Sequence, residues 1–229
     1  MPRNRPLTQT LRLCIPLVVM GGTWACSGPT GPSPLGPGGA APGSAYCALF
    51  PESQASTYVL PFGTGRRYRV SKTFGHDTPL NGGVGRYAID IDMPTGTPVL
   101  AIRGGVVVAV EERFSDSDHA VYHENWVMVR HADNTVARYI HLTQNGALVN
   151  IDDVVVQGQT VGLSGNSGDS NGPHLHFDVQ TCGPNLPPGY NNQPCGMTVP
   201  LSFRNTERQS CGLEAGRTYE ALPFAAESR

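Results

Sequence analysis

Two histidines, His174 and His176, lie two positions apart in the segment Gly-Pro-His-Leu-His-Phe at residues 172–177. In an extended strand, residues i and i+2 point to the same face of the sheet, so both imidazoles can face one pocket. Gly172 and Pro173 precede this strand and allow a loop to approach it closely. Such a pair suits a metal ion and proton transfer beside it, although the pair alone also fits surface histidines on a strand edge.

Three further polar residues stand out from apolar surroundings. Asp90 ends an apolar strand, His141 ends another, and His76 lies in a segment with the composition of a loop. Each has an ordinary explanation when taken alone: a turn former, a half-buried histidine and a surface histidine. The argument for a site is that all three join the pair of histidines around one centre.

The segments that carry these residues predict short strands separated by turns. β-branched residues dominate them, Gly or Asn-Gly separates them, and no stretch has a long 3.6-residue apolar period. Counts of 28 Gly and 20 Pro also suit a turn-rich β protein. We expect an all-β fold, an antiparallel sandwich or barrel, with strands at 67–70, 85–91, 98–102, 105–110, 126–130, 136–141, 154–156, 160–163, 175–180 and 197–203, and a short segment at 216–222.

The N-terminal residues predict export and attachment to a membrane. Residues 1–25 contain arginines followed by an apolar stretch too short to span a bilayer, which is typical of a signal peptide. Ala25-Cys26 resembles a bacterial lipoprotein processing site, so we expect lipidation at Cys26, with plain secretion after Ala25 as the alternative. Residues 26–45 are rich in Gly and Pro and predict a tether. The folded domain then covers 46–229.

The remaining cysteines agree with an exported protein. An even set in an oxidising compartment predicts two disulfides, with three possible pairings. We favour pairing Cys182 with Cys195 across a loop rich in Pro, Gly and Asn, which leaves Cys47 to pair with Cys211. A zinc site built from all four is disfavoured because no Cys-x-x-Cys motif is present. The formal net charge of -2 gives no electrostatic case for binding nucleic acid.

Seven blocks of sequence occur in an order that identifies a family resemblance. They lie at 90–99, 104–107, 125–131, 139–142, 157–162, 165–168 and 172–177. With these blocks the chain resembles the lysostaphin-type zinc endopeptidases, which cut peptidoglycan peptides. The resemblance covers residues 70–181, the expected core, and leaves 182–229 as a C-terminal extension. It implies a mostly antiparallel, two-layer β structure known as the duplicated hybrid motif.

The resemblance implies roles for the polar residues. Asp90 and His176 match two of the family's zinc ligands, and His141 and His174 match its catalytic pair. The third ligand of the family is a histidine four residues before the aspartate, where this chain has Arg86, which cannot bind zinc. Either His76 supplies this ligand from the preceding Gly-rich loop, which we favour, or the site is degenerate.

Other residues near these blocks are assigned by pattern alone. Asp92 and Asp178 are candidates for orienting the ligating rings, because each lies two positions from a ligand. His119 and His123 are four positions apart but lie in a probable loop insertion, so we expect a solvated loop and no second metal. His131 falls at a turn and is expected to be structural.

The sequence therefore predicts an exported zinc endopeptidase that acts on peptidoglycan stem peptides or cross-links at the cell envelope. A second hypothesis is a catalytically inactive regulator of the same fold that binds and activates a cell-wall amidase. The presence of Arg86 at the position of a zinc ligand favours this hypothesis. A phosphocarrier or biotinyl-type domain of related topology is a third, and the cysteines and the export signal argue against it. The oligomeric state is not predicted.

Overall fold

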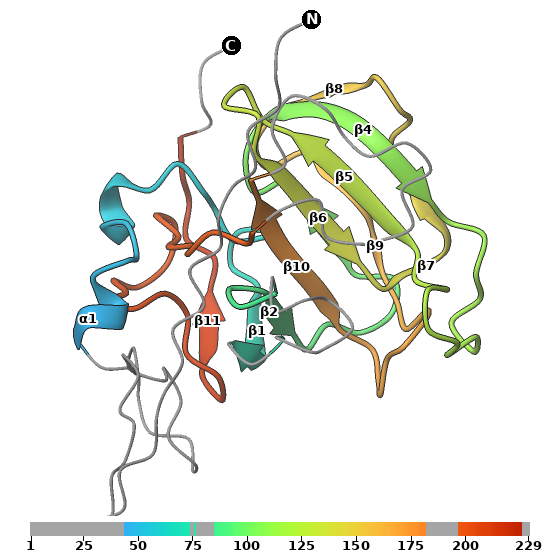
Figure 1. Cartoon of the computed structure of the whole chain (residues 1–229), viewed down its shortest axis with the longest axis horizontal. Coiled ribbons are helices and arrows are strands. Elements are labelled where there is room, and N and C mark those ends of the chain that lie inside the picture. The colour runs from blue at the N-terminus through green and yellow to red at the C-terminus, as the bar shows by residue number, and fades with distance from the viewer. Residues whose placement is uncertain (1–43, 74–75, 77–84, 182–196, 226–229) are drawn as a thin grey trace, which may run out of the picture.

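The computed structural model describes residues 44–73, 76, 85–181 and 197–225 (Figure 1). In this part of the chain almost all regular structure is β, and every strand pair is antiparallel. The helical elements there are one short turn of α-helix, α1 (Ser44–Cys47), and a 3₁₀ turn, η1 (Ser53–Ala55). None of the described helices is long and apolar enough to cross a membrane. The predicted all-β fold class is confirmed.

Two sheets make up the domain. The described strands form an eight-stranded sheet in the order β11-β1-β2-β10-β6-β5-β4-β8 and a three-stranded sheet in the order β3-β9-β7. The strands of the larger sheet are β1 (Arg67–Thr73), β2 (Ile89–Ile91), β4 (Gly105–Glu111), β5 (Trp126–Arg130), β6 (Val136–Ile140), β8 (Val154–Val155), β10 (Leu175–Gln180) and β11 (Thr218–Glu220). Those of the smaller sheet are β3 (Pro98–Leu100), β7 (Leu142–Ala147) and β9 (Thr160–Ser164).

The main core lies between the two sheets. The larger sheet contributes Val127, Tyr139 and Phe177, and the smaller contributes Val99 and Val161, all fully buried. These residues follow the two-residue period of a strand, which leaves the alternate residues of β6 and β10 on the outer face of the larger sheet. Asp90 of β2 and His176 of β10 lie on that outer face, so the apolar core fixes their strands without occupying their pocket.

The C-terminal segment completes the sheet and packs against the N-terminal segment (Figure 1). β11 pairs with β1, and a disulfide joins Cys47 to Cys211. This is one of the two pairings expected from the sequence; Cys182 and Cys195 lie outside the described residues. Residues 1–43, which hold Cys26 and most of the expected tether, also lie outside them.

Several expected strands differ from those observed. The strand expected at 197–203 is wrong: only an isolated bridge between Gln180 and Thr198 forms among its described residues, and Pro200 cannot donate to a ladder. The strand expected at 85–91 is confined to Ile89–Ile91 because 85–88 form a turn. The strand expected at 136–141 ends at Ile140, and β7 follows at once, although the sequence did not predict it.

Candidate metal centre

Strand register brings the two halves of the site together. β2 and β10 are neighbours in the larger sheet, and their register places Asp90 directly opposite His176. On its other side β10 pairs with β6, where His176 lies opposite Ile140. His141 follows Ile140 immediately. Residues far apart in the sequence therefore meet because three adjacent strands present them at the same level of the sheet.

One donor atom each from His76, Asp90 and His176 lie within 4.8 Å of one another. His76 Nε2 is 3.6 Å from Asp90 Oδ2, and His176 Nδ1 is 2.8 Å from Asp90 Oδ1. Two imidazole nitrogens and one carboxylate oxygen form a donor set that zinc favours in catalytic sites, where a fourth position stays open for water or substrate. The residues present therefore fit a zinc ion.

Arg86 takes no part in this cluster. It is half-buried and is not among the residues that line the surrounding cleft. His76 reaches Asp90 instead, from the far side of a segment, 77–84, that lies outside the described residues. This arrangement is the one required if His76 replaces the ligand missing at Arg86.

The charges of the three candidates are set by their mutual contacts. Burial raises the pKa of Asp90, but the hydrogen bond and positive charge of His176 outweigh it and hold that pKa below its usual range. Burial likewise opposes protonation of His176, yet Asp178 and Asp90 raise the pKa of its imidazole to about 9. Burial and the neighbouring His176 lower the pKa of His76 to about 3. Without a metal ion the centre thus combines an anionic carboxylate, a protonated imidazole at His176 and a neutral imidazole at His76, and a cation that binds there replaces the proton between His176 and Asp90.

His141 and His174 lie beside the cluster with their rings 4.6 Å apart. His141 Nδ1 lies 2.7 Å from the carbonyl oxygen of Ser167, and His174 Nδ1 lies 2.8 Å from that of Gly172. Each Nδ1 therefore carries the proton and donates it to a carbonyl, so each ring keeps an unprotonated Nε2 when neutral. His174 Nε2 is 3.9 Å from Asp90 Oδ1.

The direction of His141 depends on an unusual backbone conformation. Its φ is 64°, in the left-handed region, at the point where the chain passes from β6 to β7. Burial lowers the pKa of this imidazole to about 3, so the ring is neutral over the physiological pH range. A sequence pattern that predicts a strand through residue 141 cannot reveal this bend.

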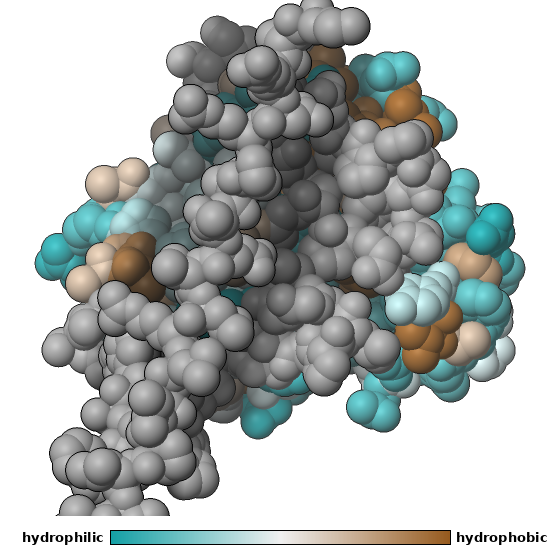
Figure 2. All heavy atoms as spheres, in the orientation of Figure 1, coloured by the Kyte–Doolittle hydropathy of each residue, from teal (hydrophilic) through white to brown (hydrophobic). Residues whose placement is uncertain are grey.

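The three candidate ligands and the two neighbouring histidines all line one cleft: His76, Asp90, His176, His141 and His174. Its volume of about 750 Å³ is typical of ligand-binding sites. Val121 and Tyr122 also line it and are about half exposed. On the face shown in Figure 2, the coloured apolar residues form small patches bordered by hydrophilic ones. The exposed side chains of Val121 and Tyr122 thus form part of the border of the cleft.

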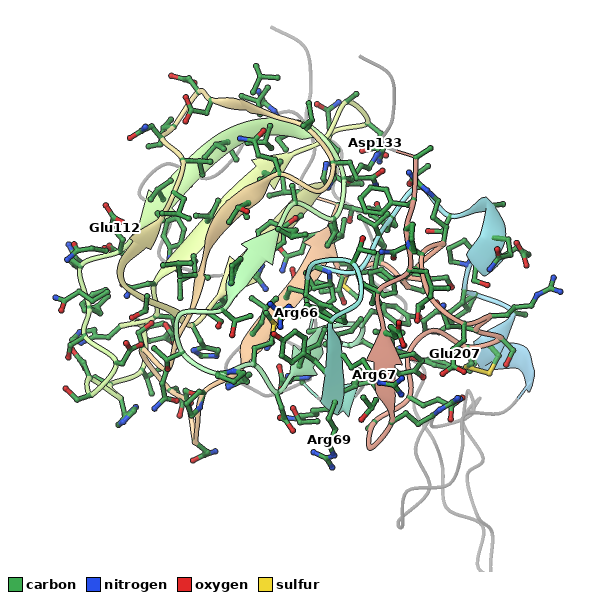
Figure 3. The ribbon with its side chains drawn as sticks, turned by 180° about the vertical axis from the view of Figure 1, so that it is seen from behind. Arg66, Arg67, Arg69, Glu112, Asp133 and Glu207 are labelled. Atoms are coloured by element: carbon green, nitrogen blue, oxygen red, sulfur yellow. A yellow bond between two sulfur atoms is a disulfide. The ribbon has the colours of Figure 1, made fainter. Side chains whose placement is uncertain are left out.

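Two carboxylates were candidates for orienting the ligating rings, and the structure separates them. Asp178 Oδ2 is 3.9 Å from His176 Nε2, and Arg138 pairs with Asp178 through two hydrogen bonds. Asp92 instead forms an ion pair with Arg69 at 3.0 Å, and Figure 3 shows Arg69 projecting outward from β1. Arg138 was not among the predicted site residues, although an arginine inside an apolar strand was a usable signal.

The other histidines play structural parts. His123 Nδ1 pairs with Asp118 Oδ2 at 2.8 Å, and its ring stacks on Phe114 in the expected loop. His131 is buried and its Nδ1 donates to the carbonyl oxygen of Gly104 at 2.9 Å. Within the described residues, neither belongs to a cluster that could hold a metal ion.

Comparison with known proteins gives a consistent result. The pattern of peptidase family M23 matches residues 85–188. The chain is 36% identical over 111 residues to the peptidoglycan DD-endopeptidase ShyA of Vibrio cholerae, covering 48% of this chain and 24% of that protein. It is 32% identical over 122 residues to the DD-carboxypeptidase/endopeptidase Mpg of Neisseria meningitidis, covering 50% and 25%. The chain spans less than a third of the length of these relatives.

Solved structures of similar proteins were also found. The catalytic domain of lysostaphin from Staphylococcus simulans is 31% identical, with 50% of this chain and 79% of that chain covered and a TM-score of 0.37. The catalytic domain of the protein EnpA from Enterococcus faecalis is 28% identical, with 63% and 95% covered and a TM-score of 0.44.

Proposed function

The chain carries a peptidase family M23 domain over residues 85–188, and from this premise we propose that it is a zinc-dependent endopeptidase that cleaves peptidoglycan peptides or cross-links. The observation that carries the proposal is the convergence of His76, Asp90 and His176 beside two further imidazoles in one cleft. Peptidoglycan is proposed as the substrate because the relatives ShyA and Mpg are named for peptidoglycan or D,D-peptide cleavage.

The protein groups divide the work of peptide hydrolysis. Zinc, when bound, polarises the scissile carbonyl and lowers the pKa of a water molecule to about 7. The Nδ1 of His174 donates to the carbonyl of Gly172 and its Nε2 faces the cleft near Asp90, so this Nε2 accepts the proton of the attacking water and passes it to the leaving amine. His141 is neutral with its Nδ1–H committed to Ser167, so its Nε2 orients the water by accepting a hydrogen bond.

The proposal is tested by measuring zinc content and muropeptide release from purified sacculi. We expect the purified protein to bind zinc and to release muropeptides, and Asp90→Asn to lose both because the only carboxylate of the donor set is neutralised. His119→Ala, in the loop that carries no metal cluster, is the matched control. A wild-type protein that binds no zinc and releases no muropeptides contradicts the proposal.

The alternative is a catalytically inactive regulator that binds and activates an amidase. Arg86, at the position where the family has a histidine ligand, favours it. The gathering of His76 with Asp90 and His176 counts against it, because a regulator needs no complete donor set. Muropeptide release by the isolated protein excludes the regulator, and release only in the presence of an amidase supports it.

We also propose that the protein is exported and held at the membrane through lipidated Cys26, with 26–45 as a tether and 46–229 as the folded domain. Two observations support export: residues 1–25 contain arginines followed by a short apolar stretch, and a disulfide joins Cys47 to Cys211. Labelling of cells with a fatty-acid analogue tests the anchor: we expect label on the wild-type protein and none on Cys26→Ala. Unlabelled wild-type protein in the medium supports plain secretion instead.

A further inference from the structure

A buried ion pair lies directly beside the proposed metal centre. The β6–β10 register places Arg138 opposite Asp178, and Asp178 lies two positions after His176 on the same face of β10. Arg138 Nε donates to Asp178 Oδ1 at 2.9 Å, and Nη2 donates to Oδ2, so the pair is bidentate. Gln180 Nε2 makes a longer contact of 3.5 Å with the same Oδ2.

The pair lies where charges are costly to bury. Asp178 is 0% exposed and Arg138 is 5% exposed. Arg138 shares its face of β6 with Val136 and Ile140, and Met128 lies opposite it on β5; these three belong to a small buried apolar cluster. Replacing a buried ion pair by apolar side chains is often neutral or stabilising. Fold stability therefore gives little reason for charges at these positions, whereas the adjacent histidine gives one.

Asp178 and Asp90 approach the two nitrogens of His176 separately. Asp178 Oδ2 is 3.9 Å from Nε2, whereas Asp90 Oδ1 is 2.8 Å from Nδ1. An imidazole that binds a metal must offer a lone pair on one nitrogen and keep its proton on the other. An anionic carboxylate near Nε2 favours the proton on Nε2, so the proton that Nδ1 shares with Asp90 is the one released when a metal ion binds, and Nδ1 then offers its lone pair.

The other imidazoles of the cleft are held the opposite way round. His141 and His174 both direct Nδ1 at a backbone carbonyl and keep Nε2 for the cleft. His76 also turns Nε2 toward Asp90, at 3.6 Å. Among the described histidines of the cleft, His176 alone places Nδ1 next to Asp90, and it is the one with a second carboxylate, Asp178, near its other nitrogen.

We propose that Asp178, clamped by Arg138, is a positioning residue that selects the Nε2–H tautomer of His176 and so makes Nδ1 its metal-binding nitrogen. The inference rests on the proposed function, because it requires the centre to bind zinc. Without the Asp178 carboxylate near Nε2, the imidazole of His176 loses the partner that favours a proton on Nε2. Outer carboxylates of this kind typically contribute about 10- to 100-fold to metal affinity.

The test measures zinc affinity of the purified full chain by competition with a chromophoric chelator. We expect Asp178→Asn to bind zinc about 10- to 100-fold more weakly than the wild type. The matched control is Asp133→Asn, which makes the same change in the exposed Arg103–Asp133 ion pair. Asp133 lies in the turn between β5 and β6, at the upper edge of Figure 3, and is not among the residues that line the cleft, so its variant should keep wild-type affinity.

A second measurement separates positioning from folding. Nitrogen-15 spectra of the histidine rings in the zinc-loaded protein report which nitrogen carries the proton, and we expect Nε2–H for His176. The double variant Arg138→Leu/Asp178→Leu removes the buried charges together; we expect it to be at least as stable as the wild type but to bind zinc about 10- to 100-fold more weakly.

Several results would overturn the inference. Wild-type affinity in either folded variant, or a proton on Nδ1 of His176 in the zinc-loaded protein, shows that Asp178 does not select the nitrogen. If both variants fail to fold, the Arg138–Asp178 pair is required for folding, and the proposed positioning role is overturned. A wild-type protein that binds no zinc overturns the proposed function itself, which keeps the two failures distinguishable.

Discussion

His174 lies just before β10 and His176 lies in it, and both line the same cleft, yet the proposed reaction gives them different roles. We predict that His174→Ala keeps its zinc but loses about 10²- to 10⁴-fold in muropeptide release, because the proton acceptor is removed while the donor set stays intact. We predict that His176→Ala loses both zinc and activity. Metal analysis of the dialysed proteins and release from sacculi check the two expectations.

The exposed His123, which pairs with Asp118 in the loop, provides the control for this comparison. His123→Ala should keep both zinc and activity. Loss of zinc from His174→Ala would contradict the division of roles and make His174 a ligand.

His131 makes the stability of the protein depend on pH at a site remote from the reaction. Burial lowers the pKa of its imidazole from 6.5 to about 4. Between these two values the unfolded chain binds a proton that the folded chain excludes, so the free energy of unfolding falls as the pH drops from 6.5 to about 4. The wild-type protein should lose about 3 kcal/mol from this residue over that range and nothing above it.

His131→Asn isolates this contribution. Asparagine keeps an N–H that can donate to the carbonyl of Gly104, but it does not titrate. His76 and His141 also have lowered pKa values, and they remain in both proteins, so the difference between wild type and variant belongs to His131. Urea unfolding at several pH values checks the prediction, and parallel curves for the two proteins would contradict it.

At the scale of strands, the residue pattern located the parts of the sheet that carry the site. It predicted β5 and β10 at their observed bounds from β-branched residues between turn residues, and the two-residue spacing predicted that His174 and His176 face one pocket. It could not predict the bend at His141 or the strand that follows, because a left-handed φ at a histidine has no signature in an apolar pattern. Arg138 was visible as an arginine inside an apolar strand, but its partner Asp178 lies on another strand, so the local pattern could not pair the two.

The loop that follows β9 supports His141, and one glycine in it is open to test. Gly168 has a φ of 74°, and a Cβ added there would lie 2.4 Å from Glu124 Cγ and 2.7 Å from the backbone nitrogen of Glu124. The adjacent Ser167 accepts the hydrogen bond from His141. We predict that Gly168→Ala destabilises the fold by about 1–3 kcal/mol and lowers activity, because the alanine strains the backbone that holds this imidazole.

Urea unfolding and muropeptide release check this prediction. The matched control is Gly63→Ala, where the nearest atom to an added Cβ is Arg66 Cγ at 4.0 Å. This substitution should change the free energy of unfolding by less than about 0.5 kcal/mol and leave activity unchanged. If Gly168→Ala behaved like the control, the loop would be more adaptable than its contacts indicate.

At the scale of the whole molecule, the site depends on segments that the seven sequence blocks do not contain. His76 lies before the first block, and only the fold shows that it reaches Asp90. Composition predicted an all-β domain, but it could not show that β11, near the C-terminus, pairs with β1. Long-range pairings of this kind depend on tertiary packing, so short-range patterns do not specify them.

The Cys47–Cys211 disulfide joins two segments separated by 164 positions. A cross-link over so long a loop removes much of the conformational freedom of the unfolded chain, and losing a native disulfide typically costs about 2–5 kcal/mol. We predict that Cys47→Ser/Cys211→Ser loses stability in this range. It should still bind zinc under conditions where it is folded, because neither cysteine belongs to the donor set.

Urea unfolding with and without a reductant checks the prediction and also probes the expected Cys182–Cys195 pair. Reductant should destabilise the wild-type protein at least as much as the double substitution does. If it destabilises the double variant further, a second disulfide is present, because Cys47 and Cys211 are no longer available in that protein. An unfolding midpoint for the double variant equal to that of the oxidised wild type would show that the cross-link between the two ends of the domain contributes nothing to stability.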